Sequence, residues 1–283
     1  MYKNPFNYGG AKYKLLSQIL PLFPDNINTL IDLFGGSGEI AFNTKADRII
    51  YNDKCLPLVN ILQNLDRNFI GEVEGIINEY GLSKENKQAF MQLKDFYNNN
   101  RNKLSNREST VILYCLLTHS FCNQIAFNSK GEYNIAFGKR WFSPQLKAKL
   151  ISYIERKEQC NISFFSKDFV NFDIVSLASA DKTFVYADPP YSITYGVYER
   201  DYFCKWSDTY DKQLLDYLSE LNDKGYKWAL SNAMVHKGIT NERLKEWSVR
   251  YNVHYLQANY EDCYYHTKGR GNIYTEEVLI TNY

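Results

Sequence analysis

Asp188-Pro189-Pro190-Tyr191 brings together three groups that could do chemistry, directly after the apolar run Thr183–Ala187. Such a run is typical of a buried strand. Neither proline has an N–H, and each fixes φ at about −65°, so the loop after the strand must be stiff and extended. It would offer a carboxylate, a free carbonyl and an aromatic face at the mouth of a sheet, which suits binding of a planar ring that carries an amine.

A second candidate site follows the predicted strand Thr29–Phe34, where the turn Gly35-Gly36-Ser37-Gly38 leads into a helix that begins near Glu39. Glycines let a ligand approach the backbone, and N–H groups at the start of a helix can face it. The G-G-x-G pattern differs from the G-x-G-x-x-G of a dinucleotide site, which argues against a nicotinamide dehydrogenase. Asp32 would repel a pyrophosphate and attract an ammonium group.

Asp53 ends the next predicted strand, Arg48–Asp53, 21 residues after Asp32. Folds with a strand–helix–strand unit often place an acid at this point on ribose hydroxyls. A ligand with ribose and ammonium groups but no phosphate is S-adenosylmethionine. Each residue also has a plain structural explanation, because a glycine turn can simply connect a strand to a helix and an aspartate can cap one.

The order of predicted elements indicates an α/β fold with an open, mainly parallel sheet. A helical pattern covers Lys12–Phe23, and a predominantly helical stretch covers Leu82 to about Asn123 with a polar loop at Asn98–Asn106. The remaining predicted helices are Leu56–Asp66, Gln145–Arg156 and Asp211–Asp223, and the remaining strands are Ile162–Phe165, Trp228–Ser231, His254–Gln257 and Val278–Thr281.

The net charge of +1 conceals a basic middle segment. Residues 84–157 hold 13 Lys and Arg against 5 Asp and Glu, a net charge of +8, and the rest of the chain has a net charge of −7. A basic segment in an acidic chain is typical of a module that binds a polyanion such as nucleic acid, although a solvated helical face is an alternative.

Composition favours an intracellular, cytoplasmic protein. The six cysteines form no C-x-x-C pair, and the four histidines show no metal-ligand spacing, so neither a disulfide framework nor a metal site is expected. The chain begins without the apolar core of a signal peptide, and no apolar run is long enough to cross a membrane.

Four segments in order make the chain resemble the DNA adenine methylase (Dam) family of D12-type, N6-adenine DNA methyltransferases. They are residues 5–16 (PFNYGGAKYKLL), Asp32–Gly38, Asp188–Tyr191 and the closing residues 276–283 (EEVLITNY). The resemblance implies a Rossmann-like sheet that binds S-adenosylmethionine, with helices on both faces. It implies a catalytic domain of residues 1–66 and 158–283 and an inserted, mainly helical DNA-recognition domain of residues 67–157.

The resemblance also implies roles for individual residues. Asp188, Pro189, Pro190 and Tyr191 would be catalytic. Tyr8 and Lys12 would border the methionine end of the cofactor, Phe34 would pack near its adenine, Asp53 would hold the ribose, and Asp168 with Phe169 would hold the adenine edge. The other residues expected around the cofactor are Gly9, Gly10, Ala11, Asp32, Gly35, Gly36, Ser37 and Gly38.

Residues 127–138 resemble a hairpin that such enzymes insert into DNA. Phe127 could act as a wedge between bases or, alternatively, be a core residue. The residues expected to contact DNA are Phe127, Asn128, Ser129, Lys130, Lys139 and Arg140. Lys130 stands where an arginine often reads a base, and Ala136 replaces a frequent proline, so the resemblance does not define the target sequence.

The expected activity is methylation of the N6 amine of an adenine that is flipped out of double-stranded DNA. A partner restriction endonuclease would be compatible with it. The alternatives are a methyltransferase with another acceptor, such as cytosine N4, RNA or a protein amide, and a non-catalytic DNA-binding relative of the fold. The presence of Asp32, Asp53 and Asp188 together favours an enzyme.

Overall fold

The computed structural model describes residues 1–6, 10–194, 206–257 and 274–283, and a central β-sheet organises this part of the chain. The strand order is β3-β2-β1-β4-β5-β8-β7, and the short β6 pairs with β5. In chain order the strands are β1 (Ile27–Asp32), β2 (Ala46–Asn52), β3 (Ile162–Phe165), β4 (Thr183–Ala187), β5 (Lys227–His236), β6 (Ile239–Thr240), β7 (Asn252–Leu256) and β8 (Thr275–Thr281).

The first five strands of the sheet path, β3 to β5, are mutually parallel, whereas β8 is antiparallel to both β5 and β7. The chain leaves β1 toward β2 on one side and returns to β4 on the other, so the strand order reverses between β1 and β4. Ligands of open α/β sheets bind at the carboxyl ends of the strands at such a reversal. The predicted α/β class with a mainly parallel sheet is confirmed.

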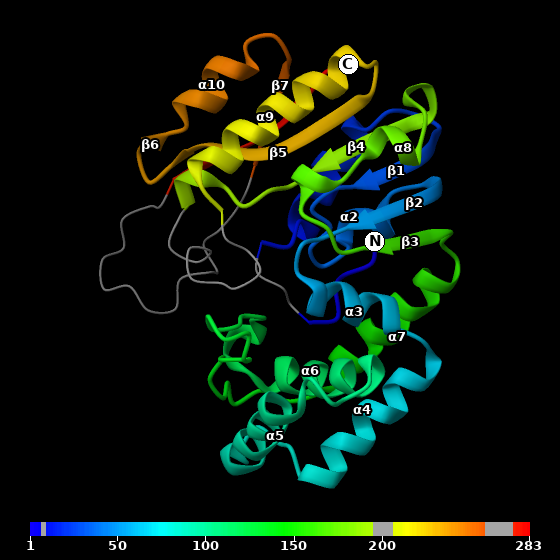
Figure 1. Cartoon of the computed structure of the whole chain (residues 1–283), viewed down its shortest axis with the longest axis vertical. Helices are drawn as coiled ribbons and strands as arrows, with labels where there is room; N and C mark the ends of the chain where they lie inside the picture. The colour runs from blue at the N-terminus through cyan, green and yellow to red at the C-terminus, as the bar shows by residue number, and fades with distance from the viewer. Residues whose placement is uncertain (7–9, 195–205, 258–273) are drawn as a thin grey trace.

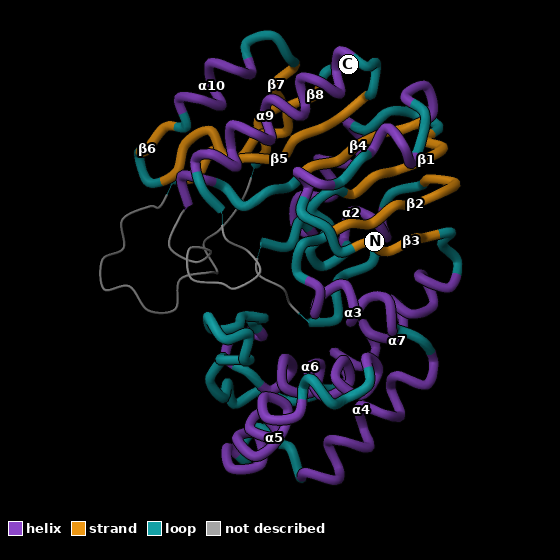
Figure 2. Tube along the Cα trace, viewed as in Figure 1, coloured by secondary structure: helices purple, strands orange, loops and turns teal. Residues whose placement is uncertain are grey.

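Helices lie on both faces of the sheet (Figure 2), and neighbouring residues of β1 point to opposite faces. Leu30 belongs to one hydrophobic cluster and Ile31 to the other. The first cluster includes α1 (Leu16–Ile19), α2 (Glu39–Asn43) and α3 (Leu56–Asn64). The second includes α8 (Ile174–Leu177), α9 (Asp208–Asp223) and α10 (Glu242–Ser248).

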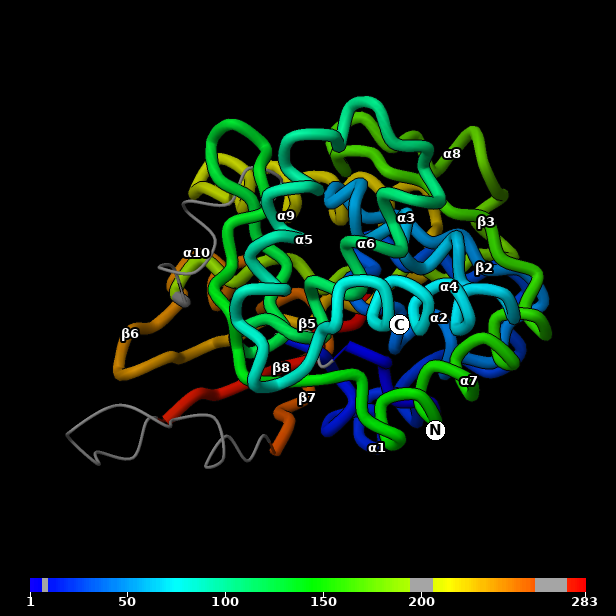
Figure 3. Tube along the Cα trace, turned by 90° about the horizontal axis from the view of Figure 1, so that it is seen from below, coloured from blue at the N-terminus to red at the C-terminus, as the bar shows by residue number. Residues whose placement is uncertain are grey.

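A helical segment lies between β2 and β3 in sequence and below the sheet in Figure 1. It contains α4 (Arg67–Tyr80), α5 (Lys87–Asn100), α6 (Asn106–His119) and α7 (Pro144–Glu158). Figure 3 shows α4, α5 and α6 gathered side by side. Ser105 and Glu108 form a capping box at the start of α6, which is buried from Thr110 to His119.

This segment shares the first hydrophobic cluster of the sheet. Phe69 of α4, Leu93 of α5 and Leu113 of α6 belong to the same cluster as Leu30 of β1 and Leu62 of α3. The boundaries 67 and 157 of a separate domain therefore stay a prediction, since the hydrophobic core runs across them.

Several elements differ from the sequence expectation. The predicted helix Lys12–Phe23 is broken into η1 (Tyr13–Leu15), α1 and η2 (Leu20–Leu22), with Pro21 in the last turn. β5 continues to His236 because β8 pairs with it past the end of the β4 ladder. The predicted hairpin forms isolated bridges, Phe127 with Tyr133 and Ser120 with Phe137, rather than strands. The helices α4 and α10 and the short strand β6 were not predicted as separate elements. In the described ranges no helix has the length and apolar character that a bilayer span requires.

Gly35 is required by packing within the protein. A Cβ built on it would lie 2.1 Å from Cε2 of the Tyr51 side chain. The Tyr51 hydroxyl donates a 2.6 Å hydrogen bond to the Gly36 carbonyl, and the Gly35 N–H donates to the Asn52 carbonyl at 2.8 Å. The glycine turn is thus locked onto β2 independently of any ligand.

Gly35→Ala should destabilise the fold by about 1–3 kcal/mol, since overpacking forces the Tyr51 ring to move. The matched control is Gly71→Ala, because Gly71 lies exposed within α4 and an added Cβ meets nothing within 4 Å. This control should stabilise the protein by about 0.5–1 kcal/mol. Urea unfolding of both variants measures the two changes in the free energy of unfolding, which should have opposite signs. Equal stability of Gly35→Ala and wild type would contradict the packing argument.

Candidate active site

The carboxylate of Asp188 lies at the carboxyl end of β4 and is engaged on both oxygens. Lys12 Nζ is 2.7 Å from Oδ2, and the Tyr191 hydroxyl donates to Oδ1 at 3.2 Å. Lys12 also donates to the Gly10 carbonyl at 3.2 Å and lies 5.2 Å from the centre of the Tyr191 ring. The structure thus brings together the predicted catalytic loop and the predicted N-terminal motif.

Burial raises the pKa of Asp188, and the ammonium of Lys12 offsets part of this effect. The Asp188 side chain is only 16% exposed and that of Lys12 only 9%. A partly buried ion pair of this kind stays sensitive to any new charge or hydrogen-bond donor that enters the site.

Asp32 ends β1 beside Tyr186 of β4 and is 1% exposed. Neither of its carboxylate oxygens has a hydrogen-bond partner among the described residues. Burial raises its pKa well above the ordinary value, and the nearby Asp188 and Asp53 carboxylates add to this. An unpartnered carboxylate in this position is suited to a cationic ligand.

Asp53 connects the end of β2 to the glycine turn. Its two oxygens accept the N–H of Gly36 at 2.9 Å and the N–H of Cys55 at 2.7 Å. Burial raises its pKa, although the side chain keeps some exposure. Asp53 therefore fixes the local backbone without capping α3. Each of its oxygens retains a lone pair that a ligand hydroxyl could use, and the ribose role stays a prediction.

An aromatic cluster surrounds the predicted adenine end. The ring of Phe34 lies 5.3 Å from that of Phe169 and 5.7 Å from that of Trp206, centre to centre. Asp168, next to Phe169, accepts hydrogen bonds from Lys54 at 2.7 Å and from the Tyr210 hydroxyl at 2.8 Å. These two contacts lower the pKa of Asp168 although burial opposes them.

Glu39, the first residue of α2, fastens the N-terminal segment to the glycine turn. It accepts hydrogen bonds from the Asn4 amide N–H at 3.1 Å, the Asn4 side chain at 2.7 Å and the Tyr13 N–H at 2.8 Å. Lys12 directly precedes Tyr13, so Glu39 fixes the backbone that carries the ammonium. Of the other predicted residues here, Gly10 and Ala11 are described, whereas Tyr8 and Gly9 lie outside the described residues.

The hairpin at 127–133 is held by its own turn. Asn128 Oδ1 accepts the N–H groups of Lys130 and Glu132 at 2.9 and 3.0 Å, and Gly131 has a φ of +71°. Phe127 is 3% exposed and packs against Tyr133. A wedge role for Phe127 is therefore inconsistent with this arrangement, and its alternative assignment as a core residue fits.

The exposed face near this hairpin is basic and aromatic. The predicted residues Ser129, Lys130, Lys139 and Arg140 are exposed, and so are Phe121 (54%) and Trp141 (50%). Phe121 adjoins the hairpin because its N–H donates to the Ala136 carbonyl at 2.8 Å. Sequence reasoning missed both aromatic residues, since exposure could not be deduced from their neighbours.

Other site residues were missed as well. Glu39, Lys54 and Trp206 gave no motif signal of their own, and Glu277 was expected only as part of the closing segment 276–283, with no role of its own. Two further predictions from the sequence fall outside the described residues: that Tyr195 and Tyr198 help to shape the pocket, and that the aromatic stretch Tyr260–Tyr265 lines the DNA cleft.

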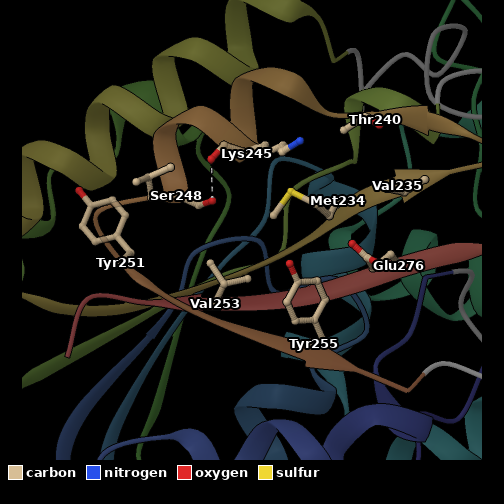
Figure 4. A pocket seen from close by; sticks show the side chains of 10 residues that line it. Met234, Val235, Thr240, Lys245, Ser248, Tyr251, Val253, Tyr255 and Glu276 are labelled. Atoms are coloured by element: carbon tan, nitrogen blue, oxygen red, sulfur yellow. Dashed lines mark hydrogen bonds between the residues drawn. The ribbon is translucent and has the colours of Figure 1, made fainter.

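A surface pocket lies elsewhere on the sheet (Figure 4), between β5, α10, β7 and β8. Met234, Lys245 and Tyr255 are among the side chains that line it, and none of the predicted site residues does. The described part of the chain holds no group of three or more His, Cys, Asp or Glu arranged to bind a metal ion.

Comparison with known proteins agrees with this geometry. The model of the D12 class N6 adenine-specific DNA methyltransferase family matches residues 8–261. The type II methyltransferase M.FokI of Planomicrobium okeanokoites is 42% identical and the modification methylase StsI of Streptococcus sanguinis 38% identical, each over 99% of this chain. The modification methylase LlaI of Lactococcus lactis is 31% identical, again over 99% of this chain.

The fold and the site thus define a Rossmann-like methyltransferase. The chain belongs to the D12 class of N6 adenine-specific DNA methyltransferases. It spans 43% of the length of each of the three relatives.

Proposed function

We propose that this protein transfers the methyl group of S-adenosylmethionine to the N6 amine of a flipped-out adenine at a specific site in double-stranded DNA. The observation that carries the proposal is the Asp188 carboxylate at the carboxyl end of β4, held by Lys12 and Tyr191 next to the unpartnered Asp32. The family match over residues 8–261 supports adenine as the acceptor rather than cytosine N4, RNA or a protein amide.

The residues of the loop suit an amine that is a poor nucleophile, because its lone pair is delocalised into the ring. Asp188 and the Pro189 carbonyl would each accept one N–H, which favours a pyramidal nitrogen with an available lone pair. Tyr191 offers an aromatic face for the extruded base. This is catalysis by positioning and electrostatics, and it needs no covalent intermediate.

The chain's acids fit the groups of S-adenosylmethionine. Asp32, which is buried and has no hydrogen-bond partner within the described ranges, would hold the α-ammonium, and the remaining lone pairs of Asp53 would hold ribose hydroxyls. Phe34, Phe169 and Asp168 would bind the adenine, with Lys54 and Tyr210 orienting Asp168. When bound, the cofactor supplies a methyl group activated by a positively charged sulfur.

The helical segment and its exposed face are proposed to bind DNA. The net charge of +8 on residues 84–157 supports attraction to phosphates, and Lys130, Lys139 and Arg140 are exposed near the hairpin. Phe121, rather than the buried Phe127, is available as an aromatic side chain to contact a base step. We propose the same division into catalytic and DNA-recognition parts as the sequence indicated.

Relatives named as type II methyltransferases and modification methylases support a cognate restriction endonuclease as a partner. In such a pair, methylation protects the host's own sites. The proposed compartment is the cytoplasm, where prokaryotic DNA and the cofactor are both present.

Asp188→Asn should lower the rate of methyl transfer at least about 100-fold, because the amide keeps the shape but loses the anion that orients the amine. The measurement is incorporation of labelled methyl groups into DNA, followed by nucleoside analysis that separates N6-methyladenine from N4-methylcytosine. Asp181→Asn is the control, since this exposed acid precedes the same strand. Full activity of Asp188→Asn, or label only on cytosine, would refute the proposal.

Binding of S-adenosylmethionine should release protons, because its ammonium stabilises the ionised form of Asp32 and so lowers the pKa that burial raises. Affinity should accordingly fall as the pH drops toward that pKa. Asp32→Asn should bind at least about 10-fold more weakly, since a hydrogen bond to a charged group is lost. Calorimetry in two buffers with different ionisation enthalpies measures the affinity and the number of protons released on binding. If both were unchanged in the variant, Asp32 would be excluded as the ammonium ligand.

Replacing Lys139 and Arg140 with alanine together should weaken DNA binding and flatten its salt dependence by about 0.9 per lost phosphate contact in a log–log plot. Fluorescence anisotropy with a labelled duplex at several salt concentrations gives the slope. Lys224→Ala serves as the control because this exposed lysine comes just before β5, at the amino edge of the sheet. A double variant with the wild-type slope would rule these residues out as phosphate contacts.

A further inference from the structure

Glu277 is a buried acid beside the candidate active site. It lies in the closing segment 276–283 that resembles the family, but the mechanism above gives it no role. It lies near the start of β8, paired with Ala233 of β5, and is 4% exposed. Because β8 is antiparallel to β5, this position is at the same sheet edge as Asp188. Its Oε2 has no hydrogen-bond partner among the described residues.

The charged and titratable groups that act on Glu277 come from two other elements. The N-terminal segment contributes Lys12, and the strand β4 with its loop contributes Asp188, Tyr186 and Tyr191. The Tyr186 hydroxyl is occupied by Ser231 of β5 at 2.7 Å. Lys12 is the cation of this group, and it is paired with Asp188.

This pairing creates a conflict for the proposed reaction. Asp188 must accept an N–H of the target amine while Lys12 lies on Oδ2 and Tyr191 donates to Oδ1. Each oxygen keeps a second lone pair, but the Lys12 ammonium neutralises the negative charge that should orient the amine. The Lys12 ammonium is largely shielded from water, so it cannot leave Asp188 without another anion to receive it. The unpartnered oxygen of Glu277 offers such a place within the same cluster.

We propose that Glu277 is a positioning residue that receives the Lys12 ammonium when the target amine takes its place at Asp188. The inference rests on the proposed function. In the structure described here, Lys12 keeps Asp188 occupied; in the complex with the extruded base, Lys12 pairs with Glu277 and leaves a carboxylate oxygen for the amine. The exchange keeps a buried cation paired throughout.

The exchange requires an ionised Glu277. Burial and the nearby Asp188 carboxylate raise the pKa of Glu277 to about 7, although Lys12 lowers it. Below this pH the carboxyl group holds a proton and cannot receive the ammonium, so Lys12 stays on Asp188. The rate of methyl transfer should therefore fall as the pH drops through neutrality.

The decisive variant is Glu277→Gln, which keeps the shape of the side chain and removes the anion. Single-turnover methylation of a duplex with the mapped target should be at least about 10-fold slower than wild type above neutral pH, and it should lose the dependence on pH across neutrality. Glu277→Asp should restore the pH dependence because it restores a carboxylate. Glu276→Gln, on the half-exposed neighbour of the same strand, should match wild type.

Folding of the variant is checked by thermal unfolding. The pKa of Glu277 is raised in the folded state, so its contribution to stability is greatest at low pH and is lost as the pH rises through about 7. Glu277→Gln should consequently have a higher Tm than wild type above neutral pH. A lower Tm across the whole range would show that Glu277 has a structural role, and it would overturn the inference.

Infrared difference spectroscopy provides a readout that does not depend on activity. Wild type should show a protonated carboxyl band that titrates near neutral pH, is missing in Glu277→Gln, and titrates at lower pH once target DNA is bound. If wild type methylates adenine while Glu277→Gln keeps its rate and pH profile, the inference alone fails. If wild type methylates no adenine, the proposed function fails and the inference fails with it.

Discussion

The site depends on one electrostatic constraint: several acids are buried at one edge of the sheet beside a single described ammonium group. Asp32, Asp188 and Glu277 all have raised pKa values because burial disfavours their charged forms. Lys12 counters this effect at Asp188, with which it is paired, and at Glu277. A cluster of this kind favours positively charged ligands and proton-sharing groups, since either relieves the repulsion among the carboxylates.

The topology explains why these acids meet although they come from distant parts of the sequence. Asp32 and Asp188 follow adjacent parallel strands at the reversal between β1 and β4, so their carboxyl ends share one edge. β8 enters the sheet in the opposite direction, so the start of this strand, with Glu277, lies at that same edge. The acids converge by strand direction alone, and Glu39 then holds the N-terminal segment close enough to supply Lys12.

Features that depend on local sequence pattern could be predicted from the sequence. Features that depend on contacts between distant segments could not. Strand ends that carry Asp32, Asp53 and Asp188 are visible in the chain, because apolar runs and proline or glycine breaks define them. The pairing of Lys12 with Asp188 has no local signal, since it depends on the fold bringing the two ends of a long loop of chain together. For Phe127 the sequence left two roles open, because a place in a hairpin does not show whether the ring faces the core or the solvent. In the structure the ring is buried.

The shared core gives a physical reason to expect that DNA contact and catalysis are coupled. The hydroxyl of Tyr114, in the buried helix α6, donates a 3.0 Å hydrogen bond to the Pro5 carbonyl, and its ring packs edge-on against Phe6 at 6.5 Å. The end of α6 leads into Ser120, which bridges to Phe137 at the base of the proposed DNA-facing hairpin. A displacement of this hairpin by DNA would therefore act on α6, and through Pro5 on the segment that positions Lys12. Because Lys12 occupies an oxygen of Asp188, the link joins the recognition surface to the group on which the proposed chemistry depends.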